Sequence, residues 1–211
     1  MLQLRAWTNR MRRGLWRLLF GRMLYGEISA QGLPLPCTRI APTTVIDHPA
    51  GLQLGDHVFI GHFNFIEASA GLRLDEGVQI TNFCSLVTHS THRSVRLLGR
   101  LGALDGGARV GDVRAPVAVG AYSFVGPHSL IEAGTQLGRG TLVAAYSRVR
   151  GKYPDFAVLA GNPAVVVGDT RQRDAAWLAA HTELAEAYRT WAGGLPEHAL
   201  AVAPSEGPQA P

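Results

Sequence analysis

Two histidines three residues apart, His89 and His92, are the side chains of this sequence best suited to chemistry. Imidazole gains and loses a proton near neutral pH and therefore serves as a general base or as a metal ligand. Both histidines stand in the stretch LVTHSTHR, just where a regular pattern gives way to a long irregular segment. Functional residues are frequent on such segments. The alternative is that both are polar loop residues without a role.

The regular pattern is an aliphatic residue at every sixth position. The series comprises Leu54, Ile60, Ile66, Leu74, Ile80, Leu86 and then Val119, Val125, Ile131, Leu137, Val143 and Val149. A period of six matches neither a helix nor a simple strand. It fits coils of about 18 residues with three short sides, which stack and bury a continuous core. The sequence therefore predicts an all-β solenoid over residues 44–170, with Cys84 at a small inward position of the core.

Two segments break from this pattern after it has begun. Residues 92–116 interrupt the hexads and predict one long protruding loop, which is typical of a functional or a disordered segment. Asp174 begins a helical pattern that predicts a C-terminal helix within residues 171–192. The Pro-, Ala- and Gly-rich tail over residues 193–211 is expected to be disordered.

The N-terminal segment, residues 1–30, predicts an amphipathic helix over residues 2–25, with apolar side chains stepping by three and four. Residues 1–26 carry six arginines and no acidic residue, so the remainder has 20 − 6 = 14 basic against 16 acidic residues. The body is therefore not a nucleic-acid surface. The helix either packs on its own domain or lies on an anionic membrane surface.

The cysteines and the apolar stretches indicate where in the cell the protein is located. Cys37 and Cys84 are the two cysteines, and they form neither a metal-type pair nor a disulfide framework. The N-terminal apolar run is interrupted by arginines and does not read as a signal peptide. No apolar stretch approaches the roughly 20 residues that cross a bilayer. We expect a cytoplasmic protein, with peripheral contact at the inner face of the membrane if residues 1–26 bind lipid.

The hexads and three further stretches resemble the hexapeptide-repeat acyltransferases, which fold as left-handed parallel β-helices. The stretches are the loop after LVTHSTHR, SFVGPHSLIEAGTQLGRGTLVAAYSRV (123–149) and AGNPAVVV (160–167). The resemblance covers roughly residues 44–170 and is greatest to the acyl-CoA branch, which includes maltose, galactoside, streptogramin and surface-polysaccharide O-acetyltransferases. It implies an acetyl-CoA-dependent O-acyltransferase that acts on a carbohydrate hydroxyl, in surface-polysaccharide or lipopolysaccharide biosynthesis. It also implies a homotrimer with active sites between subunits, no metal and no nucleic acid.

The resemblance implies roles for individual residues. The family's catalytic histidine stands where the long loop leaves the coil, which favours His92 as general base, with His89 as its neighbour or substitute. Backbone N–H groups would stabilise the oxyanion. Four further residues are candidates for contact with the acceptor substrate: Asn64, Asn82, Arg93 and His128. A polar or surface position without a role is the alternative for Asn64 and His128.

Coenzyme A has a narrow pantetheine arm and an anionic head, and the late hexads offer residues for both. Small residues for a groove along the arm are Gly126, Ala144, Ala145, Ala160 and Gly161. Arg148 and Lys152 are the candidates for the phosphates, with a solvated basic cluster as the alternative.

Three other functions remain open at this point. A γ-class carbonic anhydrase shares the fold, and Ile60-Gly61-His62 resembles one of its ligand segments, but Glu67 stands where a further histidine is expected. A non-catalytic solenoid could act as a scaffold. An acetyltransferase of this kind could also act on an aminosugar or an antibiotic.

Overall fold

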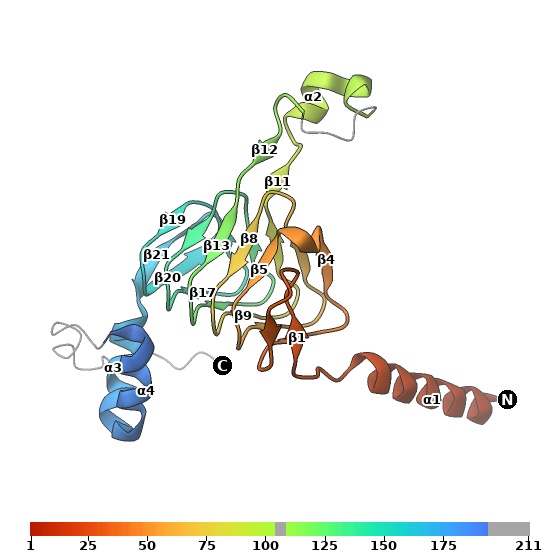
Figure 1. Ribbon diagram of the computed structural model, residues 1–211. Coiled ribbons are helices and arrows are strands. Elements are labelled where there is room, and N and C mark those ends of the chain that lie inside the picture. The colour runs from red at the N-terminus through yellow and green to blue at the C-terminus, as the bar shows by residue number, and fades with distance from the viewer. Residues whose placement is uncertain (104–108, 194–211) are drawn as a thin grey trace.

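The expected solenoid is confirmed in a computed structural model, which describes residues 1–103 and 109–193. The chain winds through three parallel sheets that run side by side along the solenoid (Figure 1). The first sheet contains β3 (Arg39–Ile40), β6 (Phe59–Ile60), β9 (Gln79–Ile80), β14 (Phe124–Val125), β17 (Leu142–Val143), β20 (Ala157–Gly161) and the antiparallel β21 (Ala164–Asp169). The second contains β4 (Val45–Asp47), β7 (Phe65–Glu67), β10 (Ser85–Val87), β15 (Leu130–Ile131) and β18 (Arg148–Val149). The third contains β5 (Leu52–Leu54), β8 (Leu72–Leu74), β13 (Val117–Val119), β16 (Gln136–Leu137) and β19 (Lys152–Tyr153).

The hexad residues form the core because each side of each coil turns one aliphatic side chain inward. In the first sheet, Ile60, Ile80, Val125 and Val143 stack in register and are fully buried. Cys84 lies inward beside them, 1% exposed, as expected. Fully burying an aliphatic side chain stabilises a fold by about 1.5–3 kcal/mol, so the repeated stacks hold the coils together.

The bend between the first and second sheets, here called the first corner, requires a left-handed backbone. Phe63, Phe83, His128 and Tyr146 occupy equivalent positions there, with φ near 60°. Their rings stack along the solenoid at centroid distances of 5.1, 4.9 and 4.8 Å. Ring stacking between successive coils offsets part of the cost of the positive φ.

The bend between the second and third sheets, here called the second corner, carries the protruding segment. That segment begins at His89, three residues before the expected loop, because β11 (His89–Ser90) pairs antiparallel with β12 (Val113–Arg114). This two-stranded stalk supports α2 (Ser94–Leu98) and the short helix Gly99–Ala103. The Ser94 hydroxyl donates to the Asp112 carboxylate and ties the helix to the returning chain.

Both ends of the chain differ from the expected helices. α1 (Leu2–Phe20) ends five residues early, and a hairpin of β1 (Glu27–Ile28) and β2 (Pro34–Leu35) leads from it into the first coil. At the other end, α3 (Thr170–Ala180) and α4 (Ala185–Ala192) replace a single helix, separated by a short helix, Thr182–Leu184. The break lets Tyr188 and Ala192 pack against Phe156 of the last coil. The tail expected to be disordered lies outside the described residues beyond Gly193.

Candidate active site

A cavity of about 210 Å³ lies at the second corner, where the stalk leaves the solenoid. It is lined by Val87, His89, Ser90, His92, Val113, Leu130, Glu132, Ala133 and Arg150. The structure therefore brings the two candidate histidines together at one hollow of the surface. The stalk supplies both histidines, and the second sheet and its corner supply the floor.

His89 is held by a buried carboxylate. Its Nδ1 atom lies 2.9 Å from Oε2 of Glu67, which is 1% exposed at the end of β7. Because Glu67 pairs in register with Val87, the chain reaches its carboxylate two residues later as it turns into the stalk. An Nδ1–H that donates to this carboxylate leaves Nε2 as the free acceptor nitrogen of a neutral His89.

Glu67 is held as an anion by its neighbours. Oε2 accepts hydrogen bonds from the backbone N–H and the hydroxyl of Thr88, at 2.9 and 2.8 Å, and Oε1 accepts from the Ser69 N–H at 2.7 Å. Burial would raise the pKa of Glu67, but the hydrogen bonds from Ser69, Thr88 and His89 outweigh it. They hold the pKa well below the ordinary value of a glutamate, so the partner of His89 is a carboxylate at neutral pH.

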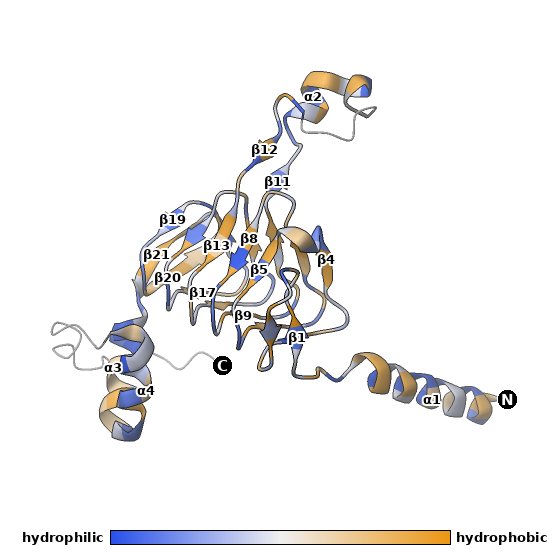
Figure 2. Cartoon of the chain, viewed as in Figure 1, coloured by the Kyte–Doolittle hydropathy of each residue, from blue (hydrophilic) through white to orange (hydrophobic). Residues whose placement is uncertain are grey.

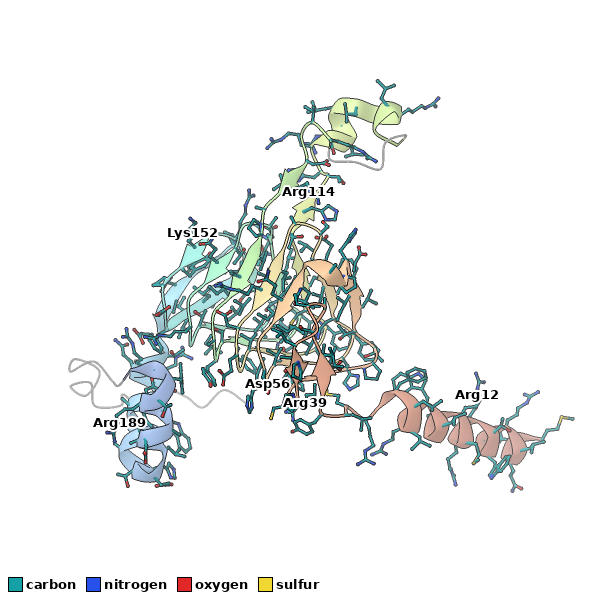
Figure 3. All side chains as sticks on the ribbon, viewed as in Figure 1. Arg12, Arg39, Asp56, Arg114, Lys152 and Arg189 are labelled. Atoms are coloured by element: carbon teal, nitrogen blue, oxygen red, sulfur yellow. The ribbon has the colours of Figure 1, made fainter. Side chains whose placement is uncertain are left out.

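The returning strand of the stalk is fastened to the same corner. Arg114, which pairs with His89 across the stalk, donates from Nη2 to the carbonyl and the hydroxyl of Ser69 at 3.2 and 3.3 Å. Ser69 in turn donates to Glu67. Figure 3 shows Arg114 at the base of the stalk. The contacts fix the direction in which His89 leaves the solenoid.

His92 and Arg93 lie further along the stalk. Nδ1 of His92 is 2.8 Å from the Ser90 hydroxyl, and the side chain is exposed at the rim of the cavity. Arg93 is exposed at the residue preceding α2, outside the set that lines the cavity. His92 therefore has a hydroxyl partner, whereas His89 has a buried carboxylate.

Glu132 contributes a second carboxylate to the cavity. Oε1 lies 3.4 Å from Nη1 of Arg148, but Oε2 is buried and has no hydrogen-bond partner. Leaving a buried acceptor unsatisfied costs about 1–3 kcal/mol, so a ligand that donates a hydrogen bond there would be favoured. Glu132 directly follows β15, Glu67 is the last residue of β7, and Val87 lies between the two in the stack.

Three of the residues predicted to contact the acceptor lie at the first corner instead. The buried amide of Asn64 donates to the carbonyls of Gly61 and Thr81, at 2.8 and 2.7 Å, and accepts from the Cys84 N–H at 2.7 Å. The Asn82 side chain accepts from the His62 N–H. His128 is stacked between two aromatic rings. Within one chain, none of these residues lines the cavity beside His89.

The residues predicted to bind coenzyme A are also divided between surfaces. Gly126, Ala144 and Ala145 follow strands of the first sheet, and Ala160 and Gly161 are the last two residues of β20 in that sheet. Arg148 is on the second sheet, where its Nε donates to Asn162 at 2.7 Å. Lys152 is exposed on the third sheet, and Figure 3 shows it near the end of the solenoid away from α1. Arg150, between them, reaches the cavity.

Across the described ranges, one group of side chains has metal-ligand spacing: Cys37, Asp56 and His57. Oδ1 of Asp56 already accepts from the N–H groups of Cys37 and His57, at 2.9 and 2.8 Å, and from the Thr38 hydroxyl. The carboxylate therefore serves the bend before β6. The histidine-ligated site of a carbonic anhydrase gains no support from this group.

Sequence reasoning missed Glu67 and Glu132 as site residues. A signal for Glu67 existed, because the first coils repeat at an offset of 20 residues, which places Glu67 opposite Val87 at the base of the loop. No comparable signal marks the unpaired oxygen of Glu132, which depends on how the neighbouring side chains pack.

Comparison with known proteins gives one relative in sequence. No model of a protein family matches the chain. A probable acetyltransferase of Mycobacterium tuberculosis is 28% identical over 143 residues, which are 68% of this chain and 44% of that protein. The chain thus spans less than half the length of this relative.

Solved structures show the same fold. A hexapeptide-repeat acetyltransferase of Vibrio cholerae, solved in complex with acetyl coenzyme A, aligns with a TM-score of 0.55 at 22% identity, over 76% of this chain and 77% of its own. A maltose O-acetyltransferase of Clostridium difficile aligns at 0.48 with 17% identity, over 61% and 64% of the two chains, and adds nothing to the assignment. In its fold and in its sequence, this chain is similar to acetyltransferases, and its solenoid is of the hexapeptide-repeat kind.

Proposed function

We propose that this chain is an acetyl-CoA-dependent O-acetyltransferase that acts on a hydroxyl group of a carbohydrate, with His89 as its general base. The contact between His89 and the buried, ionised Glu67 carries the proposal. It fixes the imidazole with one nitrogen on a carboxylate and the other free for a proton, which is the arrangement that a general base requires. The resemblance to the family favoured His92 in this role, and the carboxylate partner favours His89.

The proposed reaction needs one proton relay. Nε2 of His89 takes the proton of the acceptor hydroxyl as its oxygen attacks the thioester carbonyl, and the C–O bond forms. The tetrahedral intermediate then collapses, the C–S bond breaks, and the imidazolium returns the proton to the thiolate of coenzyme A. The products are the acetyl ester and free coenzyme A, and Glu67 stabilises the transient imidazolium without itself taking the proton.

Three basic residues support a coenzyme A site beside the cavity. Arg148 is in β18 of the second sheet, Arg150 lies in the second corner, and Lys152 is in β19 of the third sheet. Their charges suit the phosphates of the cofactor. The small residues that begin with Gly126 suit its pantetheine arm. The cofactor site residues remain predictions, as does the absence of a metal.

A homotrimer would complete the site, and two observations support it. The cavity beside His89 is smaller than the roughly 300–1,000 Å³ typical of ligand pockets. His128 and the small residues lie at a different corner of the same chain. A neighbouring copy that presents its first corner to the second corner of this one would bring the two sets together.

The proposal is tested by incubating the purified full chain with acetyl-CoA and a panel of sugars, and measuring the release of free thiol. We expect thiol release with a hydroxyl acceptor, and a loss of about a thousandfold in kcat for His89→Ala. His181→Ala, in the short segment between α3 and α4, is the matched control and should retain full activity. A folded chain that releases no thiol with any acceptor would overturn the activity, and an inactive His92→Ala beside an active His89→Ala would overturn the assigned base.

The same panel distinguishes the finer alternatives. Acetylation of an amine alone would indicate an aminosugar or antibiotic acceptor and contradict the hydroxyl. The proposed role in surface-polysaccharide or lipopolysaccharide synthesis requires an acceptor sugar of that kind. A cytoplasmic location agrees with the two free cysteines.

A further inference from the structure

The N-terminal helix α1 has no covering within the described chain. None of its 19 residues is buried, and Trp7, Met11 and Leu15 are each more than half exposed. Figure 2 shows apolar and polar residues mixed along a helix that stands clear of the solenoid. The alternative that this helix packs on its own domain does not describe the structure. Something other than the described residues is therefore needed to cover its apolar side chains.

Five of the apolar side chains form one stripe. Leu4, Trp7, Met11, Leu15 and Leu18 are separated by steps of three and four residues along α1. At 100° per residue these five side chains fall within an arc of about 80°, and Thr8, Gly14 and Leu19 extend it to about 140°. A stripe of this width that contains a tryptophan is suited to lie along an apolar boundary.

Arginines flank the stripe on both sides, and Leu2, Trp16 and Phe20 lie on the opposite side of the helix. Arg5 and Arg12 flank one side of the stripe, Arg10 and Arg17 flank the other, and Arg13 faces away from it. Figure 3 shows Arg12 projecting from the helix into open space. Residues 1–26 contain no acidic residue. Within the described part of the chain, none of these arginines forms a salt bridge. The helix therefore presents unneutralised positive charge on both flanks of its apolar stripe.

The helix is joined to the solenoid at a defined point. The Arg39 guanidinium lies 4.9 Å from the ring centroid of Tyr25 and also donates to its hydroxyl. Next to it, the Gly26 N–H donates to the Thr38 carbonyl at 3.0 Å. The chain is fixed to the first coil from Tyr25 onward, which leaves residues 21–24 as the connection on which α1 can turn.

Charge decides between the partners that could cover the stripe. Two copies of α1 packed together would bring the five arginines of each helix close to one another without an acidic residue between them. The rest of the chain, with 14 basic and 16 acidic residues, offers a second copy of α1 little net attraction. A membrane surface of anionic phospholipid offers both an apolar layer and a layer of negatively charged phosphates.

We propose that α1 binds peripherally to membranes that contain anionic phospholipid, with its apolar stripe at the acyl-chain boundary and its arginines among the phosphates. No described helix is long and apolar enough to cross a membrane, so the mode is a helix lying in the plane of the surface. Long arginine side chains beside the stripe can reach up to the phosphates while their methylene groups stay against the apolar layer. This inference is independent of the enzymatic activity proposed above.

The test is flotation of the full chain with vesicles of phosphatidylcholine alone or with about one third phosphatidylglycerol. We expect binding to the anionic vesicles that weakens as salt is raised, and little binding to phosphatidylcholine. Replacing Arg10, Arg12, Arg13 and Arg17 by glutamine should lower the partition coefficient about a hundredfold. The control Arg173→Gln/Arg189→Gln, on exposed positions of α3 and α4, should bind as the unmodified chain does.

The apolar stripe is tested with a matched pair of triple variants. Leu4→Ser, Met11→Ser and Leu15→Ser together should abolish flotation, whereas Gln3→Ser, Ala6→Ser and Asn9→Ser, off the stripe of the same helix, should retain it. Equal binding by the two triple variants, or equal binding to neutral and anionic vesicles, would overturn the proposal. So would a change of oligomeric state, in the absence of lipid, in the stripe variant alone, because a second copy would then be what covers the helix.

Discussion

The Nδ1 atom of His89 lies 2.9 Å from Oε2 of Glu67, and the two residues come from successive coils of the solenoid. Neither would meet the other without the stacking of β7 on β10, which places Glu67 opposite Val87. Glu67 is buried and His89 is one-third exposed, so the pair joins the interior of the protein to its cavity. The coil repeat that builds the core thus also orients the imidazole.

The Glu67→Gln variant tests whether the carboxylate of Glu67 orients the imidazole of His89. The amide can still accept from Thr88, but it no longer offers His89 a charged acceptor. We expect kcat to fall about 10- to 100-fold with little change in KM for acetyl-CoA, as for other residues that orient a catalytic imidazole. Steady-state kinetics of the purified variant give both constants.

Asp47→Asn is the matched control for that variant. Asp47 pairs in register with Glu67 one coil earlier, is exposed, and contacts His48 rather than His89. Its kcat should equal that of the unmodified chain. A folded Glu67→Gln variant that keeps full kcat would contradict the orienting role.

The ionised state of Glu67 also predicts a pH dependence of stability. Its pKa is lower in the folded than in the unfolded chain, so the carboxylate stabilises the fold above about pH 4.3, the ordinary glutamate value. That contribution is lost as the pH falls from there toward the pKa of the folded chain. Urea unfolding of the unmodified chain and of Glu67→Gln should differ by about 2 kcal/mol at neutral pH, with the gap narrowing in acid. A gap of constant size from about pH 7 to pH 3 would refute this account.

The core could be predicted from the sequence because it depends on a local period. An inward aliphatic residue such as Ile80 needs only its neighbours at six-residue steps to reveal a three-sided coil. The position of the loop followed from the interruption of that period, although the stalk begins at His89 because β11 pairs with β12.

The site was less predictable because it depends on which coil stacks on which. The spacing of the histidines could not show that His89 meets a buried carboxylate while His92 meets the Ser90 hydroxyl. The break after α3 could not be predicted from the sequence for a similar reason. It arises from the packing of Tyr188 on Phe156, a tertiary contact that overrides the helical pattern of the segment.

Glu132 offers a prediction about the acceptor. Its Oε2 atom is buried without a hydrogen-bond partner at the cavity, so an acceptor hydroxyl that donates to it would bind more tightly. Glu132→Gln should raise KM for the acceptor about tenfold and leave KM for acetyl-CoA unchanged. The free energy of unfolding should not fall, because the variant removes a half-buried charge with one unsatisfied oxygen.

The control for this variant is Glu183→Gln, whose carboxylate is exposed in the short helix after α3. The KM values for the acceptor and for acetyl-CoA should both be unchanged in the Glu183→Gln variant. A Glu132→Gln variant with unchanged KM for every acceptor, or with a lower free energy of unfolding, would show that the carboxylate serves the corner and not the ligand.

The Gly126→Ala variant distinguishes a role of this glycine in the packing of the coils from a role in binding the cofactor. A Cβ atom at this position would lie 2.6 Å from the Ala145 nitrogen and 2.8 Å from the Val143 carbonyl oxygen, closer than side chains approach backbone. The Gly126 N–H donates to that same carbonyl at 2.8 Å, so the coils cannot separate without losing the bond. Gly126→Ala should therefore lower the free energy of unfolding by about 2 kcal/mol or more. Gly14→Ala in α1, with no atom within 4 Å of the added carbon, should leave it unchanged or slightly higher. If Gly126 instead served only the cofactor, the alanine variant would unfold at the usual temperature and show a raised KM for acetyl-CoA.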